Sequence, residues 1–353
     1  MIKVLRRLFV TLLFTLSFSP SVMAADASDS NGSGIDVLGK VVDHDYVEFA
    51  NQKFYLPRIL LSGGEWFVYR NTATAIESGE FVATENGLLR ADGAAISLDM
   101  SITSHLLYVW FGIILTLFVT GWATSRYRSG VGADTAPKGA LHNLFEVFFV
   151  FIRDEIAKAY IPGDKYEKYV PYLFSVFMAI AFMNTFGLLP WGVSATADLT
   201  VTAVLASITF IITQFSGTKD HWKHVFWFPG VPTAVKFLMM PVEIIGLFTK
   251  PFALAIRLFA NMLSGKIMII CILGLIFIFT DLFGAYVGVG SGIFWVALTS
   301  VLYVLKLFVA LLQAYIFTLL SAVFIGMAAE EHHHADHEDD STRLSRISTV
   351  ENA

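Results

Sequence analysis

The sequence predicts an all-α integral membrane protein with five membrane helices. Hydrophobic residues make up 56% of the 353 residues and charged residues only 15%, and the mean hydropathy is +0.65. These values exclude a water-soluble globular domain, a disordered chain and a nucleic-acid-binding chain. Apolar runs that approach or exceed the length a helix needs to cross a bilayer cover 105–124, 169–190, 199–215, 236–280 and 293–328.

The chain begins with a pattern typical of a cleavable secretory signal, which we place at residues 1–24. Three basic residues precede the apolar run 8–18, and a small-residue site ends at Ala24. This run is shorter than the roughly 20 residues that a membrane helix needs. A retained first membrane helix is the alternative interpretation.

Residues 25–100 are polar and glycine-rich and contain no run long enough to span a bilayer. We expect a small region outside the membrane, a periplasmic N-terminal extension. Its stretches 53–61 and 65–69 are β-like and flank Ser62-Gly63-Gly64, which predicts a hairpin. His44 lies between two aspartates and could bind a metal, but such a group more often forms a solvated surface cluster.

Residues 101–330 hold all five predicted membrane helices. The last two apolar runs exceed one perpendicular span, so we expect long helices that are tilted or lie partly at the interface. Pro241 and Pro251 should bend the first of these two. Before the second span, apolar positions recur at helical spacing over 141–156, which predicts an amphipathic helix on the cytoplasmic surface.

The distribution of basic residues predicts the orientation in the membrane. Loops 125–168 and 216–236 are rich in Lys and Arg, whereas 191–198 and 281–292 contain neither. The positive-inside rule therefore places the two basic loops in the cytoplasm. The tail 331–353 is rich in His and acidic residues, and we expect it to be disordered and cytoplasmic, although a His-rich tract can bind metal. The protein is thus expected in a bacterial inner membrane, with a periplasmic N-terminus after signal cleavage.

Several ionisable side chains lie within the two longest apolar runs. A charge at bilayer depth costs about 2.5 to 3.5 kcal/mol and therefore indicates a functional site. Four polar positions recur every seven residues and so share one helix face: Glu243, Lys250, Arg257 and Ser264. Asn261 lies one turn past the arginine. On the last helix, a single face holds Lys306 and Gln313.

Arg257 is the hardest of these charges to explain as a structural residue. Lys250 and Lys266 can extend their amines toward the interface, but Arg257 lies near the middle of its run and stays protonated. Glu243 is about 21 Å away along the helix axis, too far to neutralise it. We therefore expect the anionic partner of Arg257 on another subunit.

The motifs around these charges resemble those of a known family. Residues 257–265 read RLFANMLSG, with an acidic residue fourteen positions before the arginine, and residues 312–317 read LQAYIF. NTFGLLP at 184–190 and TADLTVT at 196–202 complete the set. Over roughly 98–330, the chain resembles subunit a of the F-type ATP synthases. The region before this match is longer than the usual N-terminus of the family and looks like a lineage-specific elaboration in a Gram-negative bacterium.

The resemblance implies a proton-translocating stator subunit that is not itself catalytic. Such a subunit stands beside a rotating ring of c subunits, provides two offset half-channels, and couples proton flow to ring rotation and ATP synthesis. Arg257 would be the essential stator arginine, which favours the ionised carboxylate of the facing c subunit and blocks leakage between the half-channels. A potential of 100 mV releases about 2.3 kcal/mol per proton. The implied partners are the c ring, the b subunits of the peripheral stalk, indirectly F1, protons and the lipid bilayer. No cofactor or metal is implied.

By position, the resemblance also implies roles for other polar residues. Residues of the outer half-channel and its mouth would be Asn261, Gln313, Thr196, Asp198 and Thr200. Glu243 would lie toward the inner channel, and Ser264 continues the polar stripe of Arg257. The chain departs from the family at three positions. Lys266 and Lys306 stand where the family commonly has a Glu and a His, and Gly187 replaces an acidic residue of some members. We expect the lysines to line the entry pathway, with Asp198 as a candidate counter-ion; the alternative is that water alone conducts.

Other functions stay open at this point. A sodium-translocating version of the same subunit is one alternative, because the c ring largely sets the ion preference. A secondary transporter typically shows internal repeats with broken helices, and we find none. A purely structural membrane scaffold would leave Arg257 unexplained.

Overall fold

The computed structural model of the chain describes residues 46–49, 52–84, 87–93, 96–128, 139–189, 192–226 and 233–330. Five of its helices are long and apolar enough to cross a membrane, which confirms the predicted fold class. These helices are α3 (Ser104–Arg128), α6 (Tyr166–Gly187), α7 (Leu199–Ser216), α9 (Thr233–Phe283) and α10 (Ala285–Ala329). The expected signal segment, His44 and the C-terminal tail lie outside the described residues and stay predictions.

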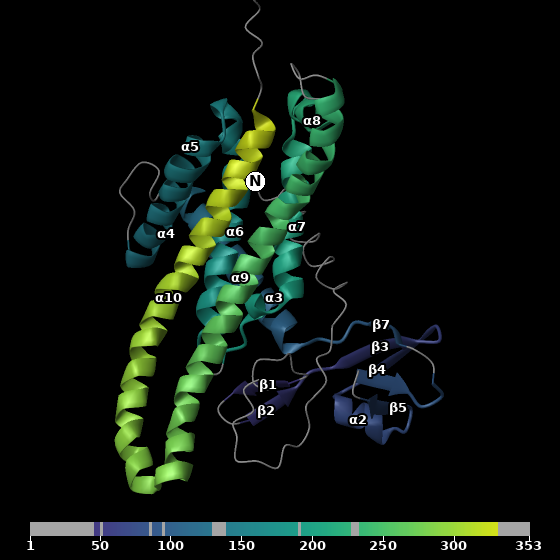
Figure 1. Cartoon of the computed structure of the whole chain (residues 1–353), viewed down its shortest axis with the longest axis vertical. Helices are drawn as coiled ribbons and strands as arrows, with labels where there is room; N and C mark the ends of the chain where they lie inside the picture. The colour runs from purple at the N-terminus through teal and green to yellow at the C-terminus, as the bar shows by residue number, and fades with distance from the viewer. Residues whose placement is uncertain are drawn as a thin grey trace, which may run out of the picture.

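Helix α6 is the central helix of the bundle. It packs against α3 and α10, and α10 runs antiparallel to the C-terminal part of α9 (Figure 1). Apolar side chains on several faces of α6 are therefore buried, among them Leu173 and Ile180, and Phe317 of α10 and Leu258 of α9 join the same core. The α6–α7 packing also includes a hydrogen bond of 2.7 Å between the hydroxyls of Tyr172 and Thr209.

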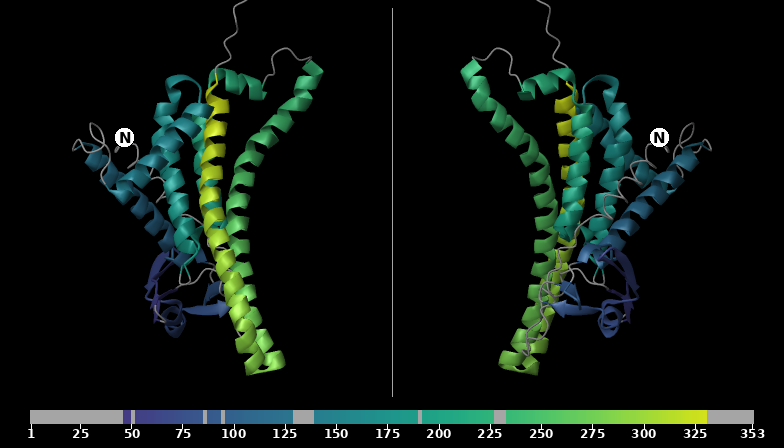
Figure 2. Two further views of the ribbon diagram at one scale, coloured as in Figure 1. Left: turned by 90° about the vertical axis from the view of Figure 1, so that its left-hand side faces the viewer. Right: turned by 90° about the vertical axis from the view of Figure 1, so that its right-hand side faces the viewer.

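The two longest helices, α9 and α10, continue beyond the other spans as a two-helix hairpin (Figure 1). Only Gly284 separates them, and its φ of +83° is one that glycine adopts without a steric penalty. Figure 2 shows that α9 curves away from α10 toward its N-terminal end, the part that contains Pro241 and Pro251. Proline removes a helical hydrogen bond and displaces the carbonyl four residues earlier. The bend that these prolines predict is present.

The described parts of the basic loops lie at one end of the helix bundle. Helices α5 (Lys158–Tyr160) and α8 (Lys219–Phe226) lie near the C-terminal end of α10, whereas the α9–α10 turn lies at the opposite end (Figure 1). The short 3-10 helix η2 (Gly163–Lys165) leads from α5 into α6. We call the end with α5 and α8 the basic end.

The predicted amphipathic helix 141–156 is present as α4 (Ala140–Phe151) and the π-helical segment η1 (Ile152–Ala157). Its faces differ from the expected pattern. Phe145 and Phe148 pack against the core, but Leu141 and Leu144 are exposed on another side, and His142 is buried. The helix is thus apolar on two sides, as suits contact with both protein and lipid.

The described residues before α3 form a small β-rich region beside the bundle (Figure 1). A three-stranded antiparallel sheet contains β3 (Arg58–Ser62), β4 (Glu65–Tyr69) and β7 (Ile96–Asp99) in the order β4-β3-β7. Two hairpins accompany it, β1 (Tyr46–Phe49) with β2 (Gln52–Tyr55) and β5 (Phe81–Thr84) with β6 (Gly87–Arg90). The region also holds the short helix α2 (Thr72–Glu77), and its core is formed by Leu60, Ala75, Phe81 and Leu88.

The predicted hairpin at Ser62-Gly63-Gly64 is confirmed as the β3–β4 turn, in which both glycines have positive φ, +62° and +87°. The single β-like stretch predicted over 53–61 is instead divided between β2 and β3. Pro57 lies in the gap, where its missing N–H rules out a regular ladder bond.

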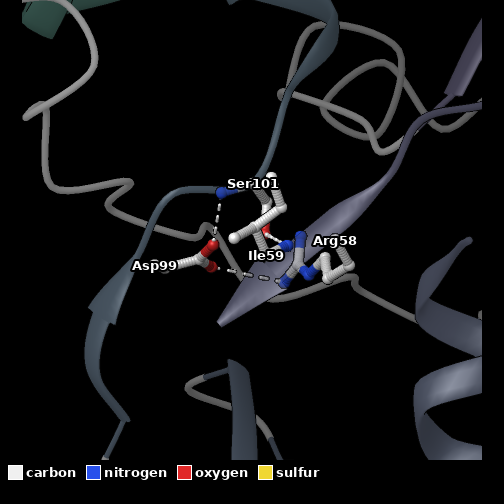
Figure 3. Close-up of polar contacts among 4 residues, drawn as sticks. All are labelled: Arg58, Ile59, Asp99 and Ser101. Carbon is white, nitrogen blue, oxygen red and sulfur yellow. Dashed lines mark hydrogen bonds and ion pairs between the residues drawn. The ribbon is translucent and has the colours of Figure 1, made fainter. Parts of the chain in front are cut away.

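A polar network connects the three-stranded sheet to the segment that leads into the first membrane helix (Figure 3). Asp99 accepts a hydrogen bond of 2.9 Å from the Ser101 backbone N–H and lies 3.7 Å from the Arg58 guanidinium. The Ser101 hydroxyl in turn accepts a bond of 3.1 Å from the Ile59 N–H. Because α3 begins at Ser104, the sheet is held only a few residues from the first span.

Candidate ion-transfer site

Arg257 lies on an exposed face of α9 in the middle part of the helix. The same face carries the exposed residues Lys250, Ala253, Ala260 and Ser264, which are three, four or seven positions from Arg257 and therefore lie on one side of the helix. We call these five residues the arginine face. Among the residues that the structure describes, no carboxylate forms an ion pair with Arg257. The guanidinium therefore points to the outside of the chain, at a depth where the surrounding side chains are apolar.

Three buried polar side chains lie where α6, α10 and the segment before α7 pack together. The Asn184 amide of α6 donates a 3.2 Å hydrogen bond to the Ala310 carbonyl of α10. Its oxygen accepts a 2.6 Å bond from the Thr196 hydroxyl, which belongs to the 3-10 helix η3 (Ala195–Ala197). Gln313 follows Ala310 by about one turn and is only 4% exposed. We call Asn184, Thr196 and Gln313 the polar cluster.

Several polar atoms in this region have no hydrogen-bond partner within the described residues. They are the Gln313 amide nitrogen, the Ser194 hydroxyl and the Tyr303 hydroxyl, all buried. Tyr303 packs against an apolar group that includes Ala197 and Ala310, next to the polar cluster. An unsatisfied buried polar group costs about 1 to 3 kcal/mol, so such groups are usually bound by ordered water. This part of the protein is therefore suited to holding water.

Gly187 explains where the Ser194 hydroxyl lies. A Cβ atom at position 187 would lie 2.8 Å from the Ser194 hydroxyl oxygen and 2.8 Å from its Cα. Ser194 thus occupies the space that a side chain at 187 would fill. The sequence has Gly187 where the resembled family has an acidic residue in some members, and the structure places a hydroxyl in that space instead.

The two lysines lie at a similar level of the neighbouring helices α9 and α10. Lys266 donates a 3.0 Å hydrogen bond from its amine to the Gly192 carbonyl, in the segment between α6 and α7. Lys306 lies over Gly265, since a Cβ at that glycine would be 3.0 to 3.1 Å from the last three atoms of the lysine side chain. The α9–α10 packing therefore brings both amines to the same level of the hairpin.

Asp198, the candidate counter-ion of these lysines, caps a helix in the structure. It is the N-cap of α7, where its carboxylate accepts a 2.7 Å hydrogen bond from the Thr200 backbone N–H. No ion pair within the described ranges links it to Lys266 or Lys306. A carboxylate that caps its own helix is held at that helix end, and its role as a counter-ion stays a prediction.

The predicted site residues thus separate into distinct groups. Thr196 and Gln313 belong to the polar cluster, Lys266 and Lys306 form the lysine pair, and Asp198 and Thr200 form the start of α7. Arg257 and Ser264 lie on the arginine face, Asn261 is half-buried beside it, and half-buried Glu243 lies about four turns closer to the basic end.

Asn184, Ser194 and Tyr303 were not among the predicted site residues. Asn184 had a sequence signal, since it is an isolated amide near the end of an apolar span. Tyr303 had none, because a tyrosine in an apolar helix is ordinarily a packing residue.

Comparison with known proteins identifies the matched region. Residues 106–326 match the family model described as ATP synthase A chain. The chain is 45% identical over 245 residues to ATP synthase subunit a of Chlorobium phaeobacteroides strain DSM 266, and this match covers 68% of each chain. It is 37% identical over 313 residues to ATP synthase subunit a of strain BS1 of that species, covering 86% of this chain and 79% of the relative. The corresponding protein of Myxococcus xanthus is 42% identical over 252 residues, which are 69% of this chain and 78% of the relative.

Proposed function

The chain belongs to the ATP synthase A chain family of non-catalytic membrane subunits, and from this membership we propose that it translocates protons as the stator subunit a of the F0 sector. In this role it forms two half-channels beside a c ring and couples proton flow to ring rotation and ATP synthesis. The observation that carries the proposal is Arg257, a permanent cation on an exposed helix face with no anionic partner among the described residues.

The chemistry of Arg257 defines the partner that it needs. A guanidinium stays charged at any physiological pH and is costly at bilayer depth unless an anion approaches it. A buried carboxylate on a c subunit that passes the arginine face would be held in its ionised form by the opposite charge. Its proton then leaves by one half-channel, and a new proton arrives by the other after the carboxylate has moved on. The fixed cation also keeps protons from passing directly between the two half-channels.

The polar cluster, with Asn261, supports a water-bearing outer half-channel. The Gln313 amide nitrogen of this cluster, together with the Ser194 and Tyr303 hydroxyls, supplies donors and acceptors for waters between the Gly192 segment and α10. Lys266 and Lys306 line this outer pathway. Glu243 lies toward the inner half-channel, about four turns from Arg257.

The arrangement of the loops supports the orientation. The basic segments lie at the same end as the C-terminus of α10, and the β-rich region lies toward the opposite end (Figure 1). In a bacterial inner membrane the positive-inside rule places the basic end in the cytoplasm, where the b subunits and F1 would be reached, and the β-rich region in the periplasm.

Replacing Arg257 tests the proposal. Inverted membrane vesicles that carry Arg257→Ala are expected to lose ATP-driven acidification, while assembly of the complex stays intact. Ile256→Ala is the matched control, because it truncates the neighbouring exposed side chain of α9 without removing the charge. Normal acidification by Arg257→Ala would refute the mechanism. Adding sodium to the assay tests the ion, since acidification that is replaced by sodium uptake would indicate the sodium-translocating version.

The role of the lysine pair has its own test. The pH profile of proton flux is expected to change in Lys266→Ala and in Lys306→Ala, because each substitution removes a titratable amine from the outer pathway. Profiles identical to that of the unaltered protein would exclude both lysines from the path and leave conduction to water alone.

A further inference from the structure

The short segment 192–197 between α6 and α7 is held by side chains of other helices. The Lys266 amine of α9 donates to the Gly192 carbonyl at 3.0 Å. The Tyr108 hydroxyl of α3 is hydrogen-bonded to the backbone of Val193. We call residues 192–197 the outer strap. Bonds from α3 and α9 therefore meet on two successive residues of the outer strap.

Close packing against α6 fixes the other side of the outer strap. A Cβ atom at Gly192 would overlap the Phe186 carbonyl oxygen at the end of α6, and Ser194 occupies the space beside Gly187. Ser194 and Thr196 are fully buried, and the Thr196 hydroxyl is bonded to α6. The outer strap thus has little room to move toward α6, and the bonds from α3 and α9 restrain the side that remains.

Tyr108 lies about one turn into α3, close to the point where the β-rich region joins that helix. The pairing of β3 continues past the end of β7, because the Met100 N–H donates to the Ile59 carbonyl at 2.9 Å. The Ile102 N–H then donates to the Pro57 carbonyl at 3.2 Å. A single residue separates this paired backbone from α3. The β-rich region and the start of α3 are therefore joined without a flexible linker.

The first turn of α3 is itself buried in the protein. Ser104 and His105 are 0% and 4% exposed, and α3 packs against both α6 and the 3-10 helix η3 of the outer strap. Coupling between distant parts of a protein is carried by packed side chains, hydrogen bonds and rigid elements of this kind. A displacement of the β-rich region is therefore expected to move Tyr108, and with it the outer strap.

The outer strap carries groups that the proposed outer half-channel needs. Ser194 and Thr196 belong to it, and its Gly192 carbonyl holds the amine of Lys266. A misplacement of about 1 Å at a functional site can lower a rate by roughly 100-fold. Even a small shift of the outer strap is therefore expected to slow the entry of protons.

We propose that the β-rich region sets the position of the outer strap, and that Tyr108 is the positioning residue that connects the two. In this way the β-rich region controls proton entry at the periplasmic face without contributing a group to the path itself. The inference rests on the proposed function, since it takes the outer strap as a wall of the outer half-channel.

Tyr108→Phe tests the connection, because it removes one hydroxyl and keeps the ring. ATP synthesis is measured in proteoliposomes that hold the whole complex with its basic end outward, at constant membrane potential and varied luminal pH. We expect the luminal proton concentration for half-maximal synthesis to rise about fivefold, the factor for one net hydrogen bond. The dependence on the outside pH should stay unchanged. The matched control is Tyr286→Phe, which removes a hydroxyl from a tyrosine that is 97% exposed at the α9–α10 turn.

Two results for an assembled Tyr108→Phe complex would overturn the role of this residue. The first is a luminal pH dependence equal to that of the unaltered protein. The second is an equal shift in the dependence on the outside pH, because the outer strap borders only the periplasmic side.

A flexible insertion tests whether the β-rich region acts through this connection. A Gly-Ser segment of about six residues between Ile102 and Thr103 would uncouple the two parts and leave each intact. We expect a luminal shift in the same direction, and no further shift when the insertion is combined with Tyr108→Phe, because both changes interrupt one connection. The control is the same insertion after Gly93, an exposed glycine between β6 and β7 at which a Cβ would meet no atom within 4 Å.

The insertion has outcomes that would overturn the proposal. One is an unchanged luminal pH dependence, and another is a pair of shifts that simply add. Reduced assembly with an unchanged pH dependence would mean that the β-rich region serves stability alone, and would overturn it as well. These results are separate from that of Arg257→Ala, which tests the site of ion transfer; a failure of the insertion test would leave the proposed function standing.

Discussion

The end of α10 at the basic end is packed against backbone, and Gly326→Ala should disrupt it. A Cβ atom at position 326 would overlap the Tyr160 carbonyl oxygen and lie 3.0 Å from its carbon. The obstacle is main chain and cannot rotate away as a side chain could. Substitution must therefore push α10 away from the segment that connects α5 with η2.

The surroundings leave little room for that shift. The Ile161 N–H donates to the Ala157 carbonyl at 3.0 Å, and its side chain is buried. On the other side, the Lys165 amine donates to the Ala329 carbonyl at 3.2 Å. Overpacking of a tight site costs about 1 to 3 kcal/mol, and we expect the upper end of this range here. A cost of about 3 kcal/mol corresponds to roughly a 100-fold change in the equilibrium between docked and undocked α10.

The assay is retention of the subunit in the detergent-solubilised complex during heating. Gly326→Ala should dissociate at a lower temperature than the unaltered protein. The control is Gly290→Ala in the same helix, where a Cβ meets no atom within 4 Å, so the higher helix propensity of alanine should leave stability unchanged or slightly raised. If both variants retain the subunit equally well, the close packing of α10 against Tyr160 is refuted.

Three further predictions concern other polar contacts. In a double-mutant cycle on heat dissociation, Asn184→Ala and Thr196→Val should show a coupling of about 0.6 to 1 kcal/mol; additive effects would mean that their hydrogen bond contributes nothing. Asp99→Asn removes the negative charge beside buried Arg58 and should destabilise the β-rich region by about 3 kcal/mol, seen as faster proteolysis. Asp92→Asn breaks only an exposed pair and should cost less than about 0.5 kcal/mol. Partial burial and the hydrogen bond with Glu80 raise the pKa of Tyr69 above its ordinary 10.0. The stabilising contribution of Tyr69 is therefore full below pH 10 and is lost as the pH rises through the raised pKa. Tyr69→Phe should weaken the alkaline loss of stability in heat-unfolding curves, and an unaltered pH dependence would contradict this assignment.

The sequence by itself determined the number and order of the membrane helices. The thickness of the bilayer sets the length of a membrane span, and apolar runs of that length can be found in the sequence without any knowledge of packing. The Gly63-Gly64 turn could also be predicted from the sequence, because glycine adopts the positive φ angles of such a turn without a steric penalty. The place of Arg257 near the middle of its apolar run and its distance from Glu243 along the helix also follow from the sequence and helix geometry alone.

The tertiary structure decided which side of each helix faces protein and which faces outward. Lipid and protein core are both apolar, so hydrophobic periodicity inside the membrane carries little information about facing. For this reason the sequence did not show that Asn184, Thr196 and Gln313 are buried near one another, or that His142 lies inward on α4. The hydrogen bonds from Lys266 to the Gly192 carbonyl and from Asn184 to the Ala310 carbonyl join segments that are far apart in the chain. Only the packing of the helices brings those segments together.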